Sequence, residues 1–182
     1  MSIDAKSALR RIKPDKRLHQ LVARPPVWTA ETFSPGLPVL LDTNIYVLNA
    51  SGRLPTAVAR ILDSHLLFHC ATCVGELLTG VAGYSPSAVG WRALQDHYQR
   101  LIDAIPSTRL LTPDEDVWAE AGLVAGVLSR TQGFQPHQRK ECLNDALIFL
   151  TAAKAGLPVL TANAADFDLI QQVCGRGAFV AT

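Results

Sequence analysis

The sequence predicts an α/β domain of three layers, with a central, mostly parallel sheet of four to five strands flanked by helices. Short, almost purely apolar runs alternate with longer stretches of helical periodicity, which is the order of strands and helices in such folds. The runs contain few polar residues, as expected for strands covered on both faces. Two of them stop abruptly at Asp, Thr and Asn residues. Because ligands of parallel sheets bind beyond the carboxyl ends of the strands, these turns are where function is expected.

The chain contains 182 residues, 48% of them hydrophobic, which suits one domain with a sizeable core. No apolar run is long enough to cross a bilayer, and residues 1–10 lack the apolar segment of a secretion signal. We therefore expect a cytoplasmic protein without a membrane partner. Cys70 and Cys73 form a CxxC, but Cys142 and Cys174 add no second pair, so we interpret all four as buried, reduced thiols rather than a zinc site.

Residues 1–37 are predicted to be a basic, Pro-rich extension, and residues 38–182 the folded domain. The extension carries seven lysines and arginines against three acids, whereas the remainder carries ten against thirteen. Residues 5–22 have the pattern of a short basic helix, interrupted at Pro14. A basic arm on a mildly acidic body is compatible with a polyanionic partner, although a solvated tail explains it too.

Each element of the domain is predicted from its periodicity and its start and stop signals. Strands are expected at 39–41, 66–69, 108–111, 158–160 and 178–181. Helices are expected at 55–62, 72–79, 87–104, 112–129, 139–154 and 166–173. Thr72 and Thr112 are the predicted N-caps of two of these helices, and Gly156 the C-cap of another.

Asp42, Glu76 and Asp145 are candidates for a catalytic centre. Asp42 directly follows an apolar strand, although a helix cap or an Asx turn explains it equally well. Glu76 is a lone acid among apolar and small residues, and Asp145 lies in a helix that is apolar almost all round, one turn after Glu141. A buried carboxylate is costly unless it is paired or binds a metal. The apolar surroundings of Glu76 and Asp145 therefore favour a functional role for these two acids over a purely structural one.

Two further acids, Asp166 and Asp168, follow the fourth predicted strand. Ordinary capping of the next helix explains Asp168 better than a catalytic role. Phe167 is expected to pack inward, which turns its two acidic neighbours in different directions. At most one of them is therefore expected to face the site.

Four segments taken together resemble the PIN-domain nucleases, and among these the toxins of VapBC-type toxin–antitoxin pairs. Each motif is weak alone, but their order, spacing and secondary-structure setting are fairly specific and span residues 38–181. The segments are Leu40-Leu41-Asp42-Thr43-Asn44, then Glu76, then Asn144-Asp145-Ala146-Leu147-Ile148, and finally Leu160-Thr161-Ala162-Asn163 with Asp166-Phe167.

The resemblance implies a metal-dependent ribonuclease whose first three acidic residues are Asp42, Glu76 and Asp145. The fourth position is often Asp in the family and is Asn163 here, so Asp166, one helical turn further on, is the alternative. The residues expected to bind the substrate near the scissile phosphate are Thr43, Asn44, Thr161 and Asn163. Arg139 and Lys140 are expected to contact the RNA backbone.

The implied chemistry is hydrolysis of an RNA phosphodiester to a 3′-hydroxyl and a 5′-phosphate. Hard oxygen ligands suit Mg²⁺ or Mn²⁺. Clustered carboxylates repel one another without a cation, whereas a bound cation activates water and stabilises charge on the phosphate. A toxin also implies a small antitoxin that covers the cleft, and a homodimer. The helices at 72–79 and 87–104 offer apolar surface for these contacts.

Two other interpretations stay open. The first is a PIN-like module that binds RNA or a protein partner without cleavage, which Asn163 in an acidic position favours. The second is a phosphohydrolase of the haloacid-dehalogenase kind, which also places an Asp after its first strand. That class needs another Asp where Asn44 stands, and Lys154 is poorly placed for its lysine.

Overall fold

The computed structural model describes residues 17–19 and 28–182. The predicted basic helix at 5–22 therefore lies outside the described residues, except for 17–19, which form no helix or strand.

Six parallel strands form the central sheet, in the order β1-β6-β5-β2-β3-β4. The predicted parallel α/β class is confirmed, with one more strand than expected. The strands are β1 (Trp28–Thr29), β2 (Val39–Leu41), β3 (Leu67–Cys70), β4 (Leu110–Leu111), β5 (Pro158–Thr161) and β6 (Ala178–Ala181). Apolar side chains fill the inner strands, and β2 is buried throughout its length.

The additional strand, β1, comes from the Pro-rich passage that the sequence places in the extension. Trp28 pairs with Val180 of β6, and the backbone N–H of Ala30 donates to Ala181 at 2.9 Å. Ala30 and Phe33 are buried in the core. Residues 28–33 therefore pack as part of the folded domain. A strand of two residues has no measurable alternation, which is why no periodicity revealed it.

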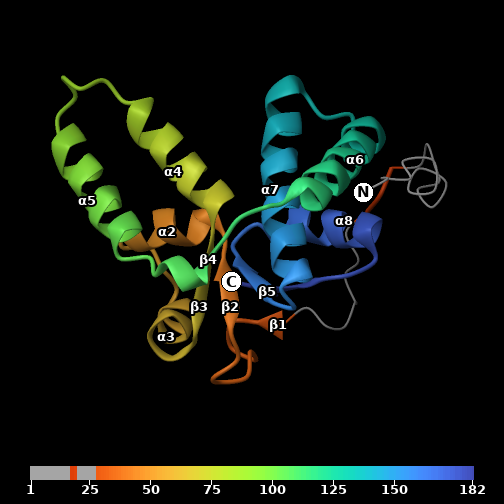
Figure 1. The fold of residues 1–182 in the computed structure, drawn as a ribbon, viewed down its shortest axis with the longest axis horizontal. Coiled ribbons are helices and arrows are strands. Elements are labelled where there is room, and N and C mark those ends of the chain that lie inside the picture. Colours follow the sequence, from red (N-terminus) through yellow and green to blue (C-terminus); the bar gives the residue numbers. More distant parts are fainter. Residues whose placement is uncertain (1–16, 20–27) are drawn as a thin grey trace.

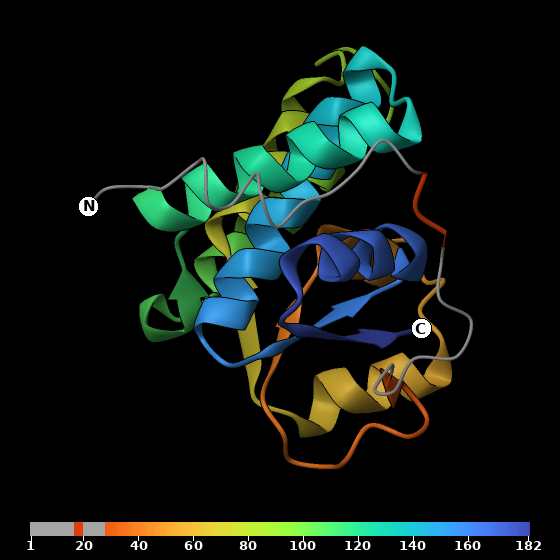
Figure 2. The same ribbon diagram turned by 90° about the vertical axis from the view of Figure 1, so that its right-hand side faces the viewer.

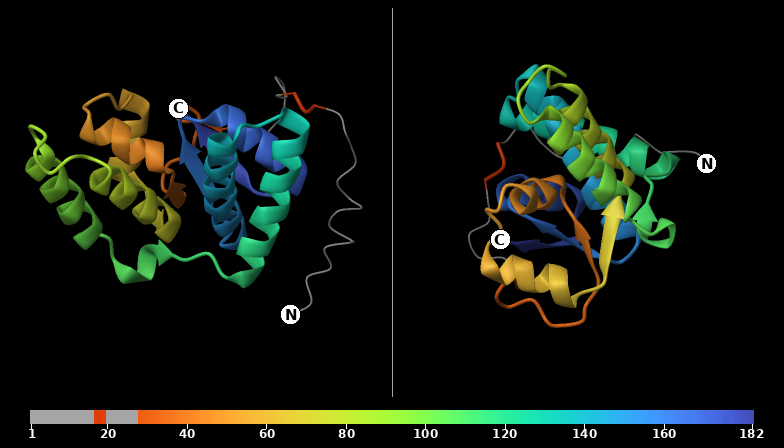
Figure 3. Two further views of the ribbon diagram at one scale, coloured as in Figure 1. Left: turned by 90° about the horizontal axis from the view of Figure 1, so that it is seen from above. Right: turned by 90° about the vertical axis from the view of Figure 1, so that its left-hand side faces the viewer.

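Seven α-helices surround the sheet in the described part of the chain (Figure 1). They are α2 (Thr43–Ala50), α3 (Thr56–Ser64), α4 (Ala71–Ala82), α5 (Trp91–Asp103), α6 (Glu115–Gln132), α7 (Pro136–Lys154) and α8 (Ala164–Cys174), with a 3₁₀ turn, η1 (Ser107–Arg109). Helix α3 lies on one face of the sheet, and α2, α7 and α8 lie on the other (Figures 2 and 3). Helix α6 packs outside α7 and α8, and α4 and α5 form a pair at one side. None of the described helices combines the length and apolar character needed to span a membrane.

The predicted helix starts differ from the observed ones by one to four residues, and one helix was not predicted. Helix α2 was not expected as an element, yet it begins directly after Asp42, whose side chain accepts from the backbone N–H of Thr43 at 2.7 Å. Thr72 lies inside α4, which begins after Cys70. Thr112 does not cap α6 either, because Asp114 takes that role by accepting from the N–H of Val117 at 3.1 Å. For α4 and α6 the helix begins at a neighbouring residue, which shifts the boundary by only a few positions.

Helix α7 contributes many of the buried residues of the core. Phe149 of α7 is fully buried and packs edge-on against Phe167 of α8, with ring centroids 5.9 Å apart. Gly177 approaches this helix closely, because a Cβ on it would lie 2.6 Å from the Phe149 Cζ atom, and its φ is +82°. The four cysteines are free, and three of them are buried, while Cys174 is partly exposed.

Candidate active site

Asp42 and Thr161 lie side by side because they occupy the ends of two neighbouring parallel strands. Leu41 of β2 pairs with Leu160 of β5, so Asp42, which directly follows β2, and Thr161, the last residue of β5, lie at the same edge of the sheet. The Thr161 hydroxyl donates to Asp42 Oδ2 at 2.6 Å, and the Asn44 amide donates to the same oxygen. Asn44 also accepts from a backbone N–H after β5 at 2.9 Å. This network fixes the Asp42 carboxylate at the strand ends.

Glu76 reaches the same edge from α4. Its two carboxylate oxygens accept from different elements, one from the hydroxyl of Thr43 in α2 and one from the Asn144 amide of α7 at 2.7 Å. The carboxylate of Glu76 therefore connects three helices. Both donors stand next to another predicted acid, Thr43 beside Asp42 and Asn144 beside Asp145.

Asn163 connects the two remaining acids. Its side-chain amide donates to Asp166 at 2.8 Å and to Asp145 at 3.3 Å. Its backbone N–H donates to the Thr161 hydroxyl at 2.8 Å, which ties this loop to the Asp42 network. Asn163 thus contacts two carboxylates, and Asp166 lies beside it.

The four predicted acids line a single hollow of about 470 Å³, which we call the acidic hollow. Eight of the nine predicted site residues line it or bond to a residue that does. The lining consists of Asp42, Thr43, Asn44, Val47, Leu48, Glu76, Glu141, Asp145, Ala162, Asn163 and Asp166. It contains five carboxylates and, among the residues that the structure describes, no Lys or Arg.

Glu141 is the acid that the sequence did not assign to the site. It stands one helical turn before Asp145 on α7, and both side chains line the acidic hollow. The spacing from Asp145 could have indicated Glu141, because residues four apart on a helix share a face. The same position, however, is also typical of a solvent-exposed acid in the first turn of a helix.

Two of the carboxylates hold their protons more tightly than an exposed Asp does. Burial raises the pKa of Asp42 to about 6, against the hydrogen bonds from Thr161 and Thr43 that lower it, and Glu76 adds to the rise. Burial also raises the pKa of Asp145 well above its ordinary value, and the charges of Asp42 and Asp166 raise it further. Desolvation and like charges both disfavour the ionised form. The acidic hollow therefore favours an added positive charge.

A divalent cation fits the donor chemistry of the acidic hollow. Carboxylate and amide oxygens are hard ligands of the kind that Mg²⁺ and Mn²⁺ prefer. In the described residues, however, no three His, Cys, Asp or Glu side chains are positioned to hold an ion as they stand. The carboxylates are instead occupied by hydrogen bonds from Thr43, Asn44, Asn144, Thr161 and Asn163.

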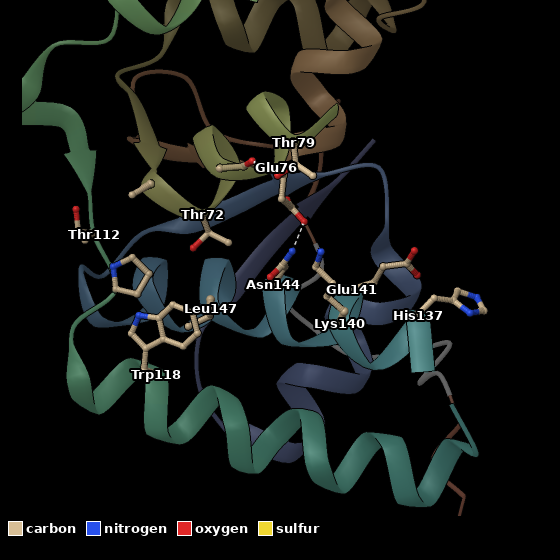
Figure 4. A pocket seen from close by; sticks show the side chains of 13 residues that line it. Thr72, Glu76, Thr79, Thr112, Trp118, His137, Lys140, Glu141, Asn144 and Leu147 are labelled. Carbon is tan, nitrogen blue, oxygen red and sulfur yellow. Dashed lines mark hydrogen bonds between the residues drawn. The ribbon is translucent and has the colours of Figure 1, made fainter. Parts of the chain in front are cut away.

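Arg139 is the one predicted site residue that the structure does not bring to the acidic hollow. It lies against α6, and its Nε donates to the carbonyl oxygen of Phe134 at 3.1 Å. The next residue, Lys140, lies on another face of α7. It lines a second hollow of about 630 Å³, which we call the side pocket (Figure 4). Glu76 and Glu141 line both hollows, so the two adjoin.

No protein-family model matches the sequence, and no curated protein matches it significantly. Several solved structures do match. FitAcB from Neisseria gonorrhoeae aligns with a TM-score of 0.57 at 23% identity, over 79% of this chain and 96% of that chain. VapBC-1 from nontypeable Haemophilus influenzae aligns at 0.55 and 19% identity, over 79% and 97%. VapBC2 from Rickettsia felis, bound to a promoter DNA fragment, aligns at 0.53 and 14% identity, over 79% and 96%.

These likenesses establish the fold. The chain has the PIN-like α/β architecture of the FitAcB and VapBC structures, and it spans nearly the whole length of the chains it matches. The resemblance that the sequence motifs indicated is thereby confirmed at the level of the fold. A shared fold does not determine function, which depends on the residues of the site.

Proposed function

We propose that this chain is a divalent-metal-dependent ribonuclease and the toxin of a toxin–antitoxin pair. The observation that carries the proposal is the convergence of four acids from four separate segments on one hollow. Asp42, Glu76, Asp145 and Asp166 come from a strand end and three different helices. Packing alone does not require such a cluster, because each buried carboxylate costs free energy unless a cation compensates it.

Asp42, Glu76, Asp145 and Asp166 would hold Mg²⁺ or Mn²⁺ in the acidic hollow. The cation would supply an activated water and stabilise charge on the phosphate during an in-line displacement. We assign the fourth acidic position to Asp166 rather than to Asn163, because a carboxylate binds a cation more strongly than an amide does.

The residues around these acids would position the substrate. Thr161 and Asn44 hold the Asp42 carboxylate in place through their hydrogen bonds. The Asn163 amide lies between Asp145 and Asp166 and can donate to a phosphate oxygen once a cation takes over those carboxylates. Helices α2 and α8 begin beside the acidic hollow, and the N-terminal end of a helix favours an anion.

A small antitoxin is the proposed protein partner. The FitAB and VapBC structures with the same fold include complexes with DNA fragments. By analogy we propose that an antitoxin covers the acidic hollow of this chain and that the toxin pairs with a second copy of itself. We also propose that the protein acts in the cytoplasm, where its four free thiols stay reduced.

The decisive experiment is cleavage of a mixed RNA substrate with Mn²⁺ or Mg²⁺, comparing the wild type with Asp145→Asn. The wild type should cut the RNA to products with a 5′-phosphate, and Asp145→Asn should not. Asp63→Asn is the matched control, because Asp63 is exposed on α3 and lines neither hollow. Equal activity in the wild type and Asp145→Asn would remove the nuclease assignment.

One observation favours the alternative of an RNA-binding module without cleavage. Asn163 stands where the family often has an acid, and its amide occupies the neighbouring carboxylates. Under that alternative, the wild type would bind the RNA and leave it intact with either metal. The cleavage assay, together with a measurement of RNA binding, therefore separates the two functions.

A further inference from the structure

The side pocket adjoins the acidic hollow and differs from it in chemistry. Its volume of about 630 Å³ lies in the range of small-molecule sites. Helix α4, the start of α6 and one face of α7 form its walls. Its lining consists of Ala71, Thr72, Gly75, Glu76, Thr79, Thr112, Pro113, Trp118, His137, Lys140, Glu141, Asn144 and Leu147.

Trp118 is the largest apolar side chain at this pocket, and it is 52% exposed. It lies near the start of α6, next to Val117, which is buried in the core. The indole therefore stays out of the core and faces the pocket. Figure 4 shows it beside Leu147 at one end. An exposed aromatic face at a hollow is suited to stacking against a planar ligand group.

Lys140 supplies a cation that the acidic hollow lacks. Figure 4 places it with His137 at the opposite end of the pocket from Trp118, with the Glu76–Asn144 hydrogen bond between them. The hydroxyls of Thr72, Thr79 and Thr112 add donors and acceptors along the wall. The pocket thus combines a stacking surface, hydroxyls and one ammonium group, next to the proposed catalytic acids.

We infer that the side pocket binds one nucleotide of single-stranded RNA next to the scissile phosphate, with its base stacked on Trp118 and its backbone phosphate near Lys140. This inference rests on the proposed ribonuclease function. Stacking of bases on aromatic side chains is the common way in which proteins hold unpaired RNA. Because every base has a flat face, this subsite grips the strand without demanding a strict sequence. Glu76 and Glu141 line both hollows, so a strand seated here continues directly into the acidic hollow.

An apolar peptide fits this lining less well than a nucleotide does. Trp118 and Leu147 are the large apolar side chains of the pocket, whereas its other end carries Lys140, His137 and Glu141. A peptide that buried its own apolar groups would leave this charged end unsatisfied. A phosphate placed there would instead gain an ion pair with Lys140.

The test measures binding of a fluorescent, single-stranded RNA of about twelve nucleotides, long enough to cross both hollows. Asp145→Asn serves as the background so that binding is measured without cleavage. In this background Trp118→Ala should weaken binding about tenfold, and Trp118→Phe should retain most of it, because a phenyl ring still stacks. Leu66→Ala is the matched control, since Leu66 is 50% exposed and lines neither hollow.

A series of RNAs with one abasic position each locates the stacked base. At one position, loss of the base should weaken binding to the Trp118 chain about tenfold and leave binding to Trp118→Ala unchanged. A merely structural role for Trp118 would give no such position. The inference is overturned if no position behaves so, or if Trp118→Ala changes the oligomeric state in size-exclusion chromatography while RNA binding is kept.

The inference and the proposed function fail in different ways. If the wild type cleaves RNA and Trp118→Ala binds and cleaves like the wild type, the inference alone is wrong. If the wild type and Asp145→Asn neither bind nor cleave any RNA, the proposed function is wrong and the inference falls with it.

Discussion

The acidic hollow and the side pocket share two residues, Glu76 and Glu141, but they are built in opposite ways. In the acidic hollow, Asp42 is 2% exposed and held by hydrogen bonds from two side chains and a backbone N–H. In the side pocket, Trp118 is half exposed, and no hydrogen bond to Lys140 or Trp118 side chains is seen in the described part of the chain.

Under the proposed function, the acidic hollow carries out the cleavage and the side pocket binds the RNA strand. A group that must bind a cation at a fixed position needs a rigid setting, which the strand ends and their hydrogen bonds supply. A group that contacts a flexible strand needs surface and can stay mobile. We therefore expect substitutions in the acidic hollow to affect the rate of cleavage, and substitutions in the side pocket to affect mainly the affinity for RNA.

Glu76→Gln should cause the largest effect, because Glu76 belongs to both hollows. Glutamine keeps the shape and one acceptor oxygen, but it removes the negative charge. We expect the cleavage rate at saturating RNA to fall about a thousandfold, which corresponds to the several kcal/mol that a metal centre supplies. Single-turnover cleavage with Mn²⁺ measures it. A variant that keeps its rate but binds RNA weakly would place Glu76 with the side pocket instead.

A divalent cation should stabilise the folded protein. A ligand that binds only the folded state at one hundred times its Kd adds about 2.7 kcal/mol to the free energy of unfolding. Thermal melts with and without Mn²⁺ measure this rise, and a chelator should reverse it. Asp145→Asn should lose most of the rise, whereas Asp63→Asn should keep it. An equal rise in both variants would mean that the ion binds elsewhere.

Without metal, stability should fall as the pH rises from about 4 to about 6. The pKa of Asp42 is about 6 in the folded protein, against about 3.9 in an unfolded chain. The folded state thus keeps a proton that the unfolded state has lost, so the stabilisation is present at low pH and disappears as the pH rises. Each pH unit should cost about 1.4 kcal/mol.

Urea unfolding in a chelator across this pH range tests the dependence on pH. Added Mn²⁺ should flatten the curve, because the cation replaces the proton as the partner of the carboxylates. A metal-free protein whose stability rises steadily between these pH values would contradict the raised pKa of Asp42.

Lys140→Ala should have the smallest effect of these changes, and we expect it to alter only RNA binding and its dependence on salt. Loss of one phosphate contact should weaken RNA binding roughly fivefold and reduce the slope of log affinity against log salt by about 0.7. Arg139→Ala is the matched control, because Arg139 is the preceding residue and lies against α6 instead. Equal losses in the two variants would indicate a general effect of charge rather than a contact in the side pocket.

The parallel fold and the acids could be predicted because each left a local signal. The apolar run before Asp42 and the continuous apolar character around Asp145 mark a strand end and a buried helix. In contrast, the pairing of Trp28 with Val180 joins segments about 150 residues apart and depends on tertiary packing alone. A two-residue strand offers no pattern to detect.

The parts of the site that the sequence did not predict depend on which face of a helix meets the hollow. Arg139 and Lys140 are adjacent, and both were expected near RNA, but neighbours on a helix point about 100° apart, so they lie at different pockets. The sequence did not indicate a binding role for Trp118 either, since a tryptophan near the start of a helix is more often buried in the core. Only the three-dimensional arrangement separates these cases.

The close approach of Gly177 to Phe149 links a peripheral turn to helix α7, which carries Asp145. Phe149 stands one turn after Asp145 on α7, and any Cβ at position 177 would meet its ring at 2.6 Å. The ring is fully buried and packs against Phe167. A bulkier residue in this turn would therefore push on α7 itself, and the displacement would be transmitted along the helix to a carboxylate that position 177 never touches.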